Sequence, residues 1–310
     1  MSKLVVSEYL QEEFLEILRQ EHKVVFDPDM YSDRPRLLEE VADADAIFIR
    51  NRTMIDEELI SAAEGMQVIG RLGVGLDNID MDACDRVGVK VIPASGANAV
   101  SVAEYVIGAM LTLTRGVFGM TPSMVAGEWP RQGHAFGHEV MGKTLGLVGF
   151  GAIAREVAAR AGGFGMRNIA HDPFIPETDP VWQSASRVGF DELLTGADVI
   201  SLHTPLNAET RSLIDTRALA MMKPTCVLIN TSRGGIVDEG AVAESLRRGE
   251  LGGAALDVFA SEPLGPKPAA VFADLPNLVL TPHVAGNTHE SVDRVARMIV
   301  GAVLGALKAG

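Results

Sequence analysis

The chain has 310 residues, of which 47% are hydrophobic and 22% charged, values that suit an α/β protein with two well-formed cores. Its 27 basic and 41 acidic residues give a net charge of −14, which argues against nucleic acid or an anionic membrane surface as a partner. Cys84 and Cys226 are isolated, and we find neither a signal peptide nor an apolar run of membrane-spanning length. These features predict a soluble, cytoplasmic protein.

The first hundred residues alternate between short apolar runs and helical patterns. Strands are predicted at 3–7, 23–27, 46–50, 67–72 and 90–92, with helices between them at 8–20, 36–42, 56–63 and 80–87. Such alternation predicts a doubly wound parallel sheet with helices on both faces. A helix at 290–308 carries an apolar stripe, and we expect it to return to this first domain. The first domain is therefore predicted to comprise residues 1–97 plus 287–310.

Residues 144–154, TLGLVGFGAIA, combine a buried strand predicted over 145–150, a glycine turn and the start of a helix. Gly149, Gly151 and Ala154 match the G-x-G-x-x-G/A dinucleotide fingerprint, in which the glycines allow a tight turn and the close approach of a pyrophosphate. Asp172 ends the next predicted strand and can accept hydrogen bonds from a ribose. No Arg or Lys follows closely to hold a 2′-phosphate, so NAD is expected as the cofactor rather than NADP.

Further buried strands are predicted at 198–202, 226–230, 254–258 and 278–280. They continue the parallel sheet that begins at residue 145, so residues 98–286 are predicted to form a Rossmann domain that binds NAD. The fold class is therefore α/β with two doubly wound parallel-sheet domains, and the first domain is expected to bind the substrate.

Three polar residues follow three strands of the second sheet, where parallel sheets bind ligands. Arg233 follows the strand at 226–230, Glu262 follows 254–258 and His283 follows 278–280. An imidazole can move a proton near neutral pH, a carboxylate can orient it, and a guanidinium can bind a carboxylate and polarise a C2 oxygen. The trio thus favours reversible oxidation of a 2-hydroxy acid. No metal site is expected, because no ligand cluster has suitable spacing.

In the first domain, residues 71–78 place glycines directly after a strand, where successive N–H groups can bind an anion. A tight turn without a ligand remains the alternative. Arg50, Arg52 and Arg71 lie at predicted strand ends, which suggests a second anionic group on the substrate. The alternative is that these arginines form surface salt bridges.

Seven motifs together closely resemble the D-isomer-specific 2-hydroxyacid dehydrogenase family over nearly the whole chain. They are RLGVGLDN (71–78), GANAVSVAE (96–104), GFGAIA (149–154), HTPL (203–206), NTSRGG (230–235), LDVFASEP (256–263) and PHVAG (282–286). The resemblance implies that Arg233, Glu262 and His283 are catalytic and that Val74 and Gly75 bind the substrate carboxylate. It also implies cofactor contacts, in addition to Gly149 and Gly151, at Ala152, Ile153, Asp172, Thr204, Thr231, Ser232, Asp257 and Gly286.

The resemblance implies a homodimer and leaves several substrates open. The chain is similar to 3-phosphoglycerate dehydrogenases, sulfolactate dehydrogenases and glyoxylate/hydroxypyruvate reductases. The excess of cations in the first domain favours a dianionic acid of the first two kinds. From another functional class, NAD-sensing corepressors share this fold and the trio, so a binding protein is the remaining alternative.

Overall fold

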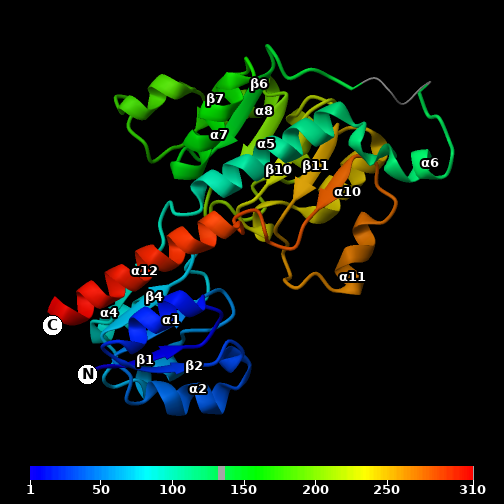
Figure 1. Ribbon diagram of the computed structural model, residues 1–310. Coiled ribbons are helices and arrows are strands. Elements are labelled where there is room, and N and C mark those ends of the chain that lie inside the picture. Colours follow the sequence, from blue (N-terminus) through cyan, green and yellow to red (C-terminus); the bar gives the residue numbers. More distant parts are fainter. Residues whose placement is uncertain (132–136, 310) are drawn as a thin grey trace. The chain divides into compact units, whose positions relative to one another are not determined.

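The computed structural model describes residues 1–131 and 137–309, and in it the chain forms two compact α/β units (Figure 1). One unit contains Met1–Asn98 and Asn287–Gly310, and the other contains Ala99–Gly286. Each unit has its own parallel sheet.

The sheet of the first unit has the strand order β2-β1-β3-β4-β5. Its strands are β1 (Lys3–Val6), β2 (Lys23–Phe26), β3 (Ala46–Ile49), β4 (Val68–Arg71) and β5 (Lys90–Pro93). This is the flavodoxin-like order, in which the chain reverses direction across the sheet between β1 and β3.

Helices cover both faces of this sheet and bury a separate apolar cluster on each. They are α1 (Glu12–Arg19), α2 (Arg34–Val41), α3 (Glu57–Ala62), α4 (Met81–Val87) and α12 (His289–Ala309), with a 3₁₀ turn at Met30–Ser32. The last helix packs closely on β4. A Cβ placed on Gly70 of β4 would lie only 2.8 Å from side-chain atoms of both Ile299 and Val303 of α12. Both chain ends therefore lie in this unit, as Figure 1 shows.

The sheet of the second unit has the order β12-β11-β10-β9-β6-β7-β8, and its strands are all parallel. The strands are β6 (Thr144–Val148), β7 (Arg167–His171), β8 (Ser186–Arg187), β9 (Val199–Leu202), β10 (Val227–Asn230), β11 (Gly253–Leu256) and β12 (Leu278–Leu280). The order is that of a Rossmann sheet with one added strand, and it reverses between β6 and β9. The predicted fold class is confirmed.

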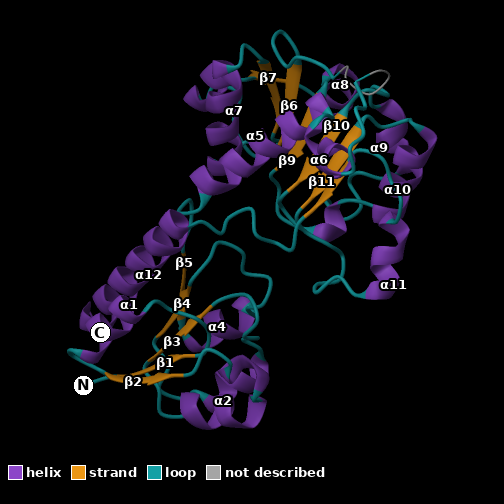
Figure 2. Ribbon diagram, turned by 45° about the vertical axis from the view of Figure 1, so that its right-hand side comes forward, coloured by secondary structure: helices purple, strands orange, loops and turns teal. Residues whose placement is uncertain are grey.

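Helices lie on both faces of the second sheet, with α5 and α7 on one face and α8, α9 and α10 on the other (Figure 2). The α-helices of this unit are α5 (Ala99–Arg115), α6 (Thr121–Val125), α7 (Ala152–Gly163), α8 (Phe190–Gly196), α9 (Thr216–Met221), α10 (Glu239–Arg248) and α11 (Pro266–Ala269). Short 3₁₀ turns lie at Phe118–Met120, Pro180–Ser184, Gly234–Ile236 and Ala270–Phe272. Two large apolar clusters, one on each face, make up most of its core.

Two predicted boundaries differ from the structure for physical reasons. The helix predicted to begin at residue 8 begins at Glu12, because Glu8 is used in tertiary hydrogen bonds to the loop after β3. The strand predicted to end at Phe150 ends at Val148, because Gly149 has a φ of +83° and turns the chain out of the sheet.

Among the described residues, no single helix has both the length and the apolar character needed to cross a membrane. One bent pair, Ala99–Arg115 with Phe118–Val125, passes that test by length and composition alone, with 73° between its two parts.

Candidate active site

The three candidate catalytic residues follow three neighbouring strands of the second sheet. Arg233 follows β10, Glu262 follows β11 and His283 follows β12. Because these strands are parallel, their carboxyl ends lie on one edge of the sheet, so the topology brings the three loops to the same edge.

Glu262 and His283 form a hydrogen-bonded pair at this edge. The Nδ1 atom of His283 lies 2.7 Å from Oε2 of Glu262. The other carboxylate oxygen of Glu262 accepts the N–H of Phe259 at 3.0 Å, which holds the carboxylate in place. With Nδ1 engaged in this way, Nε2 is the ring nitrogen left to exchange a proton with a substrate. Both side chains are partly exposed, so a ligand can reach them.

A buried carboxylate holds the turn that carries His283. Asp257 is 1% exposed, and its Oδ1 accepts hydrogen bonds from the hydroxyl of Thr281 (2.6 Å) and the N–H of Val284 (2.9 Å). Its Oδ2 accepts the N–H of Ala285 at 2.9 Å, and its main-chain oxygen accepts the N–H of His283 at 2.7 Å. These bonds keep His283 at a φ of +56°, a left-handed conformation that costs a non-glycine residue about 1 kcal/mol or more.

Arg233 lies in an extended segment that is fixed at both ends. Its main-chain oxygen accepts a hydrogen bond from the Asn230 amide at 2.9 Å, and its Nη1 donates to the oxygen of Ser232 at 2.6 Å. The next residue, Gly234, packs so closely on the chain after β11 that a Cβ there would lie 1.8 Å from the carbonyl carbon of Phe259. Only glycine fits this contact, which ties the Arg233 loop to the loop leading to Glu262.

The turn after β6 has the shape that a dinucleotide needs. A Cβ at Gly149 would lie 2.5 Å from the carbonyl oxygen of His203, so a side chain cannot be placed there. Gly151 is the N-cap residue of α7, and no side chain caps this helix. A Cβ at Gly151 would meet no other atom within 4 Å, so the space before the helix N-terminus is open to an anion. Ala152 and Ile153 form the first turn of this helix.

The remaining predicted cofactor residues follow β7, β9, β10, β11 and β12. Asp172 follows β7, and its Oδ2 accepts the N–H of Phe150 at 2.9 Å, which joins it to the glycine turn. Thr231 follows β10, and its buried hydroxyl oxygen has no hydrogen-bond partner in the described part of the chain. An enclosed glycine turn, an open helix N-terminus and this unpaired hydroxyl fit a bound dinucleotide.

Four further predicted cofactor residues differ in whether their polar groups can still form a hydrogen bond to a cofactor. Ser232 is buried, and its hydroxyl donates to the oxygen of Leu202 at 2.6 Å, so its proton is already used. Thr204 follows β9 and is partly buried, and Gly286 is the last residue of the second unit. The carboxylate of Asp257 accepts three hydrogen bonds and keeps a lone pair on Oδ2 for a further donor.

In the first unit, a glycine turn after β4 leaves two backbone donors available. Within the described chain, the N–H groups of Val74 and Gly75 donate no hydrogen bond. Arg71 is buried beneath the turn and donates from Nε to the oxygen of Gly75 at 2.9 Å. A Cβ at Gly73 would lie 2.2 Å from Nη1 of Arg71, so the arginine and the glycine together determine the shape of the turn.

Arg50 and Arg52 follow β3, the neighbour of β4, but they differ in environment. Arg50 is partly buried, and its guanidinium makes no hydrogen bond to any described residue. Desolvation lowers the pKa of Arg50, and the charges of Glu8 and Tyr9 oppose this only in part. Arg52 is exposed, with its guanidinium carbon 5.1 Å from the centre of the Tyr31 ring and an Nη1 hydrogen bond to the hydroxyl of that tyrosine.

Residues 107–285, more than half of the chain, match the model of the NAD-binding domain of D-isomer specific 2-hydroxyacid dehydrogenases. The chain belongs to the D-isomer specific 2-hydroxyacid dehydrogenase family. Membership brings an NAD-binding domain, and the chain has the activity of an NAD-dependent 2-hydroxyacid dehydrogenase.

Relatives of known name differ in the acid they act on. The chain is 50% identical over 308 residues to the (S)-sulfolactate dehydrogenase of Chromohalobacter salexigens. This match covers 99% of this chain and 99% of that protein. It is 40% identical over 275 residues to the D-3-phosphoglycerate dehydrogenase of Mycobacterium leprae, covering 89% of this chain but 51% of that protein, so it spans about half of that relative's length. A glyoxylate reductase structure from Paecilomyes thermophila superposes with a TM-score of 0.88 at 31% identity, covering 98% of this chain and 95% of that one.

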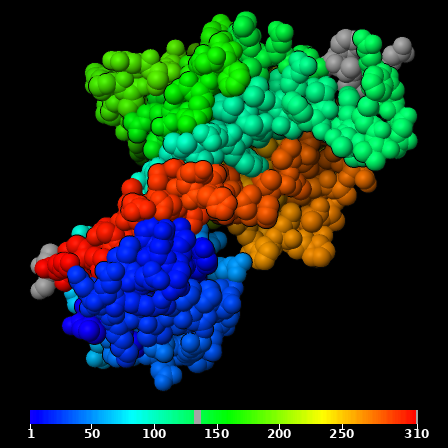
Figure 3. Space-filling model, viewed as in Figure 1, coloured from blue at the N-terminus to red at the C-terminus, as the bar shows by residue number. Residues whose placement is uncertain are grey.

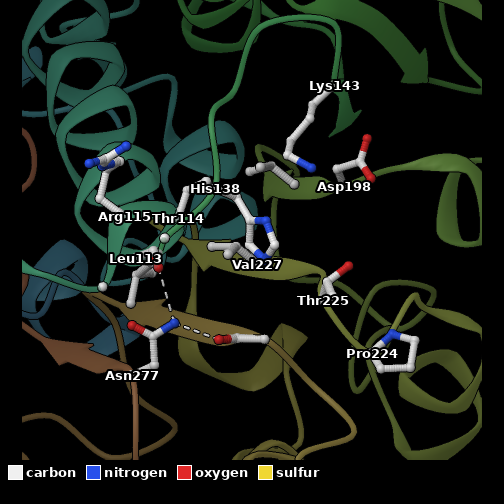
Figure 4. A pocket seen from close by; sticks show the side chains of 14 residues that line it. Leu113, Thr114, Arg115, His138, Lys143, Asp198, Pro224, Thr225, Val227 and Asn277 are labelled. Carbon is white, nitrogen blue, oxygen red and sulfur yellow. Dashed lines mark hydrogen bonds between the residues drawn. The ribbon is translucent and has the colours of Figure 1, made fainter. Parts of the chain in front are cut away.

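A pocket of about 260 Å³ lies at the opposite edge of the second sheet from Arg233, Glu262 and His283 (Figure 4). It is lined by residues that precede strands, among them Lys143 before β6 and Asp198 before β9. Asn277 donates from Nδ2 to the main-chain oxygens of Leu113 and Gly252, which closes this edge. None of the predicted site residues lines the pocket. Within the described residues, no group of three or more His, Cys, Asp or Glu side chains could hold a metal ion.

Sequence reasoning missed two sets of residues that shape the site. Tyr105 and Thr281 support the carboxylate that holds His283, and Glu8 with Thr53 supports the loop that carries Arg50. Their positions in the sequence could have identified two of these residues. Glu8 and Thr281 each directly follow a predicted strand, and polar residues at such positions lie at the ligand-binding edge of a parallel sheet.

Proposed function

We propose that the substrate is a small 2-hydroxy acid, or the matching 2-keto acid, with a second anionic group such as the sulfonate of sulfolactate or the phosphate of 3-phosphoglycerate. The observation that carries this proposal is the partly buried guanidinium of Arg50, which makes no hydrogen bond to the described residues. A desolvated cation that makes no hydrogen bond is costly, and a bound anion would compensate it. The similarity to the (S)-sulfolactate dehydrogenase, which covers 99% of that protein, supports the same substrate class.

The two anions of such a substrate can be assigned to neighbouring strand ends of the first unit. Ile49 of β3 and Arg71 of β4 are paired in register, so Arg50 and the Val74–Gly75 turn follow adjacent strands. We assign the C1 carboxylate to the N–H groups of Val74 and Gly75, and the second anion to Arg50 with Arg52 beside it. Accordingly, residues 1–97 plus 287–310 are proposed as the substrate domain, and residues 98–286 as the cofactor domain.

The chemistry is assigned to the trio of the second unit. His283 takes the hydroxyl proton at Nε2 when the alcohol is oxidised and returns it when the ketone is reduced, while Glu262 holds the ring through Nδ1. Arg233 donates to the substrate carboxylate and to the C2 oxygen, and removing such a donor costs about 3–4 kcal/mol in the transition state. Gly149, Gly151 and Asp172 would hold NAD, which would supply or accept the hydride at C2.

The decisive experiment compares sulfopyruvate with pyruvate, since the two 2-keto acids differ only by the sulfonate. NADH consumption is followed with both acids for the wild type, Arg50→Gln and Arg52→Gln. Arg50→Gln is expected to raise KM for sulfopyruvate by about 10- to 100-fold, the value of a lost charge-assisted hydrogen bond, and to change KM for pyruvate by less than about twofold. The matched control is Arg34→Gln, because Arg34 already pairs with Asp56 and Glu58 and should affect neither acid.

Equal effects of Arg50→Gln on the two acids would show that Arg50 binds no second anion. A wild-type preference for glyoxylate or hydroxypyruvate over sulfopyruvate and phosphohydroxypyruvate would keep the reaction class but replace the proposed substrate with that of a glyoxylate/hydroxypyruvate reductase.

We further propose that the chain works as a cytoplasmic homodimer. Phe118, Val125 and Trp129 expose large apolar side chains within one short segment, as expected of a surface that a second copy covers. Cys84 and Cys226 are both free and buried, which suits a reducing compartment.

A further inference from the structure

The first unit has an anion-binding arrangement of backbone amides at the point where its strand order reverses. Ligands of such sheets bind beyond the carboxyl ends of the two strands at this reversal, here β1 and β3. Glu8 follows β1, and the loop that contains Arg50, Arg52 and Thr53 follows β3.

The carboxylate of Glu8 occupies this arrangement itself. Glu8 is 4% exposed, and its carboxylate oxygens accept the N–H groups of Arg50 (2.7 Å), Arg52 (3.2 Å) and Thr53 (3.0 Å). It also accepts the hydroxyl of Thr53 at 2.9 Å. Backbone amides that surround one anion form a nest of the kind that proteins use to bind phosphate and other anions. The substrate is therefore excluded from these amides.

The loop is held on its other side as well. The side-chain amide of Asn78 donates to the main-chain oxygens of Arg50 (3.0 Å) and Thr53 (2.6 Å). The hydroxyl of Ser7, the residue before Glu8, lies 2.8 Å from that of Thr53. The loop backbone is thus held from two sides, and the guanidinium of Arg50 makes no hydrogen bond to any described residue.

We infer that Glu8 is a positioning residue that sets the preference for dianionic over monoanionic acids, because it fixes the loop that presents Arg50. This inference rests on the proposed role of Arg50. By filling the nest, Glu8 prevents the second anion from binding these backbone amides. The second anion is left with a guanidinium, whose planar set of donors suits a sulfonate or phosphate.

The test uses two variants, because removal of Glu8 also removes a charge close to Arg50. Glu8→Ala is expected to raise KM for sulfopyruvate at least tenfold relative to KM for pyruvate, as the loop loses its anchor. Thr53→Val changes no charge and replaces the hydroxyl with a methyl group of similar size. It should therefore raise the ratio of KM for sulfopyruvate to KM for pyruvate by about threefold. Thr53→Ser keeps the hydroxyl, so its ratio of KM for sulfopyruvate to KM for pyruvate should equal that of the wild type. In all three variants, kcat with pyruvate should stay close to the wild-type value.

Three outcomes would overturn the inference: equal KM changes for the two acids, a lower KM for sulfopyruvate in Glu8→Ala, or no rescue by Thr53→Ser. The Arg50→Gln variant is measured beside them. If Arg50→Gln separates the two acids and Thr53→Val does not, Glu8 has no positioning role although the proposed substrate class stands. If Arg50→Gln itself fails to separate them, the proposed substrate class fails first.

Discussion

His203, the first residue after β9, combines an enclosed imidazole with a strongly shifted proton equilibrium. Nδ1 is buried without a partner among the described residues, and Nε2 lies 2.9 Å from the hydroxyl of Ser201. Desolvation lowers the pKa of His203 to about 3. An unfolded histidine titrates near pH 6.5, so below that pH the unfolded chain takes up a proton that the folded chain does not accept until about pH 3.

The folded state should therefore lose stability as the pH falls below 6.5, by about 2 kcal/mol at pH 5 from His203 alone. Replacing the residue with a neutral one should remove this loss. We expect His203→Gln to narrow the difference between the free energies of urea unfolding at pH 7.5 and pH 5. The exposed His289 provides the matched control, and His289→Gln should keep the wild-type difference. If both variants behave alike, His203 is not the group responsible.

At the scale of elements, the sequence was most informative where local patterns decide the structure. The strand predicted at 46–50 is β3, Ala46–Ile49, because a short apolar run bounded by polar residues is too short for a buried helix and fits a strand covered on both faces. The positions of Arg233, Glu262 and His283 at strand ends could be read for the same reason. The start of α1 could not, because the hydrogen bonds of Glu8 reach residues more than 40 positions away.

The support of His283 was equally invisible to local patterns. The residues that hold its turn come from α5, from the residue after β11 and from the residue after β12, and only the folded sheet brings them together. Roles for individual cofactor residues such as Ser232 stay predictions, since a motif states which residue is present but not which of its hydrogen bonds are already made.

A directed chain of hydrogen bonds connects α5 to this turn. A carboxylate can only accept, so the Thr281 hydroxyl donates to Asp257 and must accept from the hydroxyl of Tyr105, which lies 2.6 Å away. Thr281→Val breaks both bonds and removes one of the three donors to the carboxylate. We expect kcat to fall about tenfold for sulfopyruvate and pyruvate alike, because the turn that carries His283, the proposed base, loosens, while KM changes little.

Thr281→Ser keeps the hydroxyl and should recover most of the lost kcat. A loss that appears in KM with unchanged kcat, or that serine fails to recover, would mean that this chain of hydrogen bonds does not position the turn that carries His283. The effect on both acids separates this variant from those of the Arg50 loop, which should act on sulfopyruvate alone.

At the scale of the whole molecule, alternation of strand and helix patterns was sufficient to predict two doubly wound sheets, and the strand orders agree with it. The surface through which copies of the chain associate could not be predicted in the same way, because a linear sequence does not show which apolar side chains stay outside the core. Val125 is 83% exposed and Trp129 75%, and the segment with α6 lies on the outer surface of its unit (Figure 3). Several large apolar side chains exposed within one short segment mark an interaction site more often than a single exposed residue does.

If this segment joins two copies, a charge placed in it should separate them. Val125→Glu would bury a carboxylate without a partner in the interface, at a cost of several kcal/mol per copy, which is enough to dissociate a dimer at micromolar concentration. Light scattering coupled to size exclusion should give the dimer mass for the wild type and the monomer mass for Val125→Glu. Val87→Glu is the matched control, since Val87 is 61% exposed on α4 in the other unit, and this variant should remain dimeric. A monomeric wild type, or a dimer that persists in Val125→Glu, would assign the exposed segment some other role.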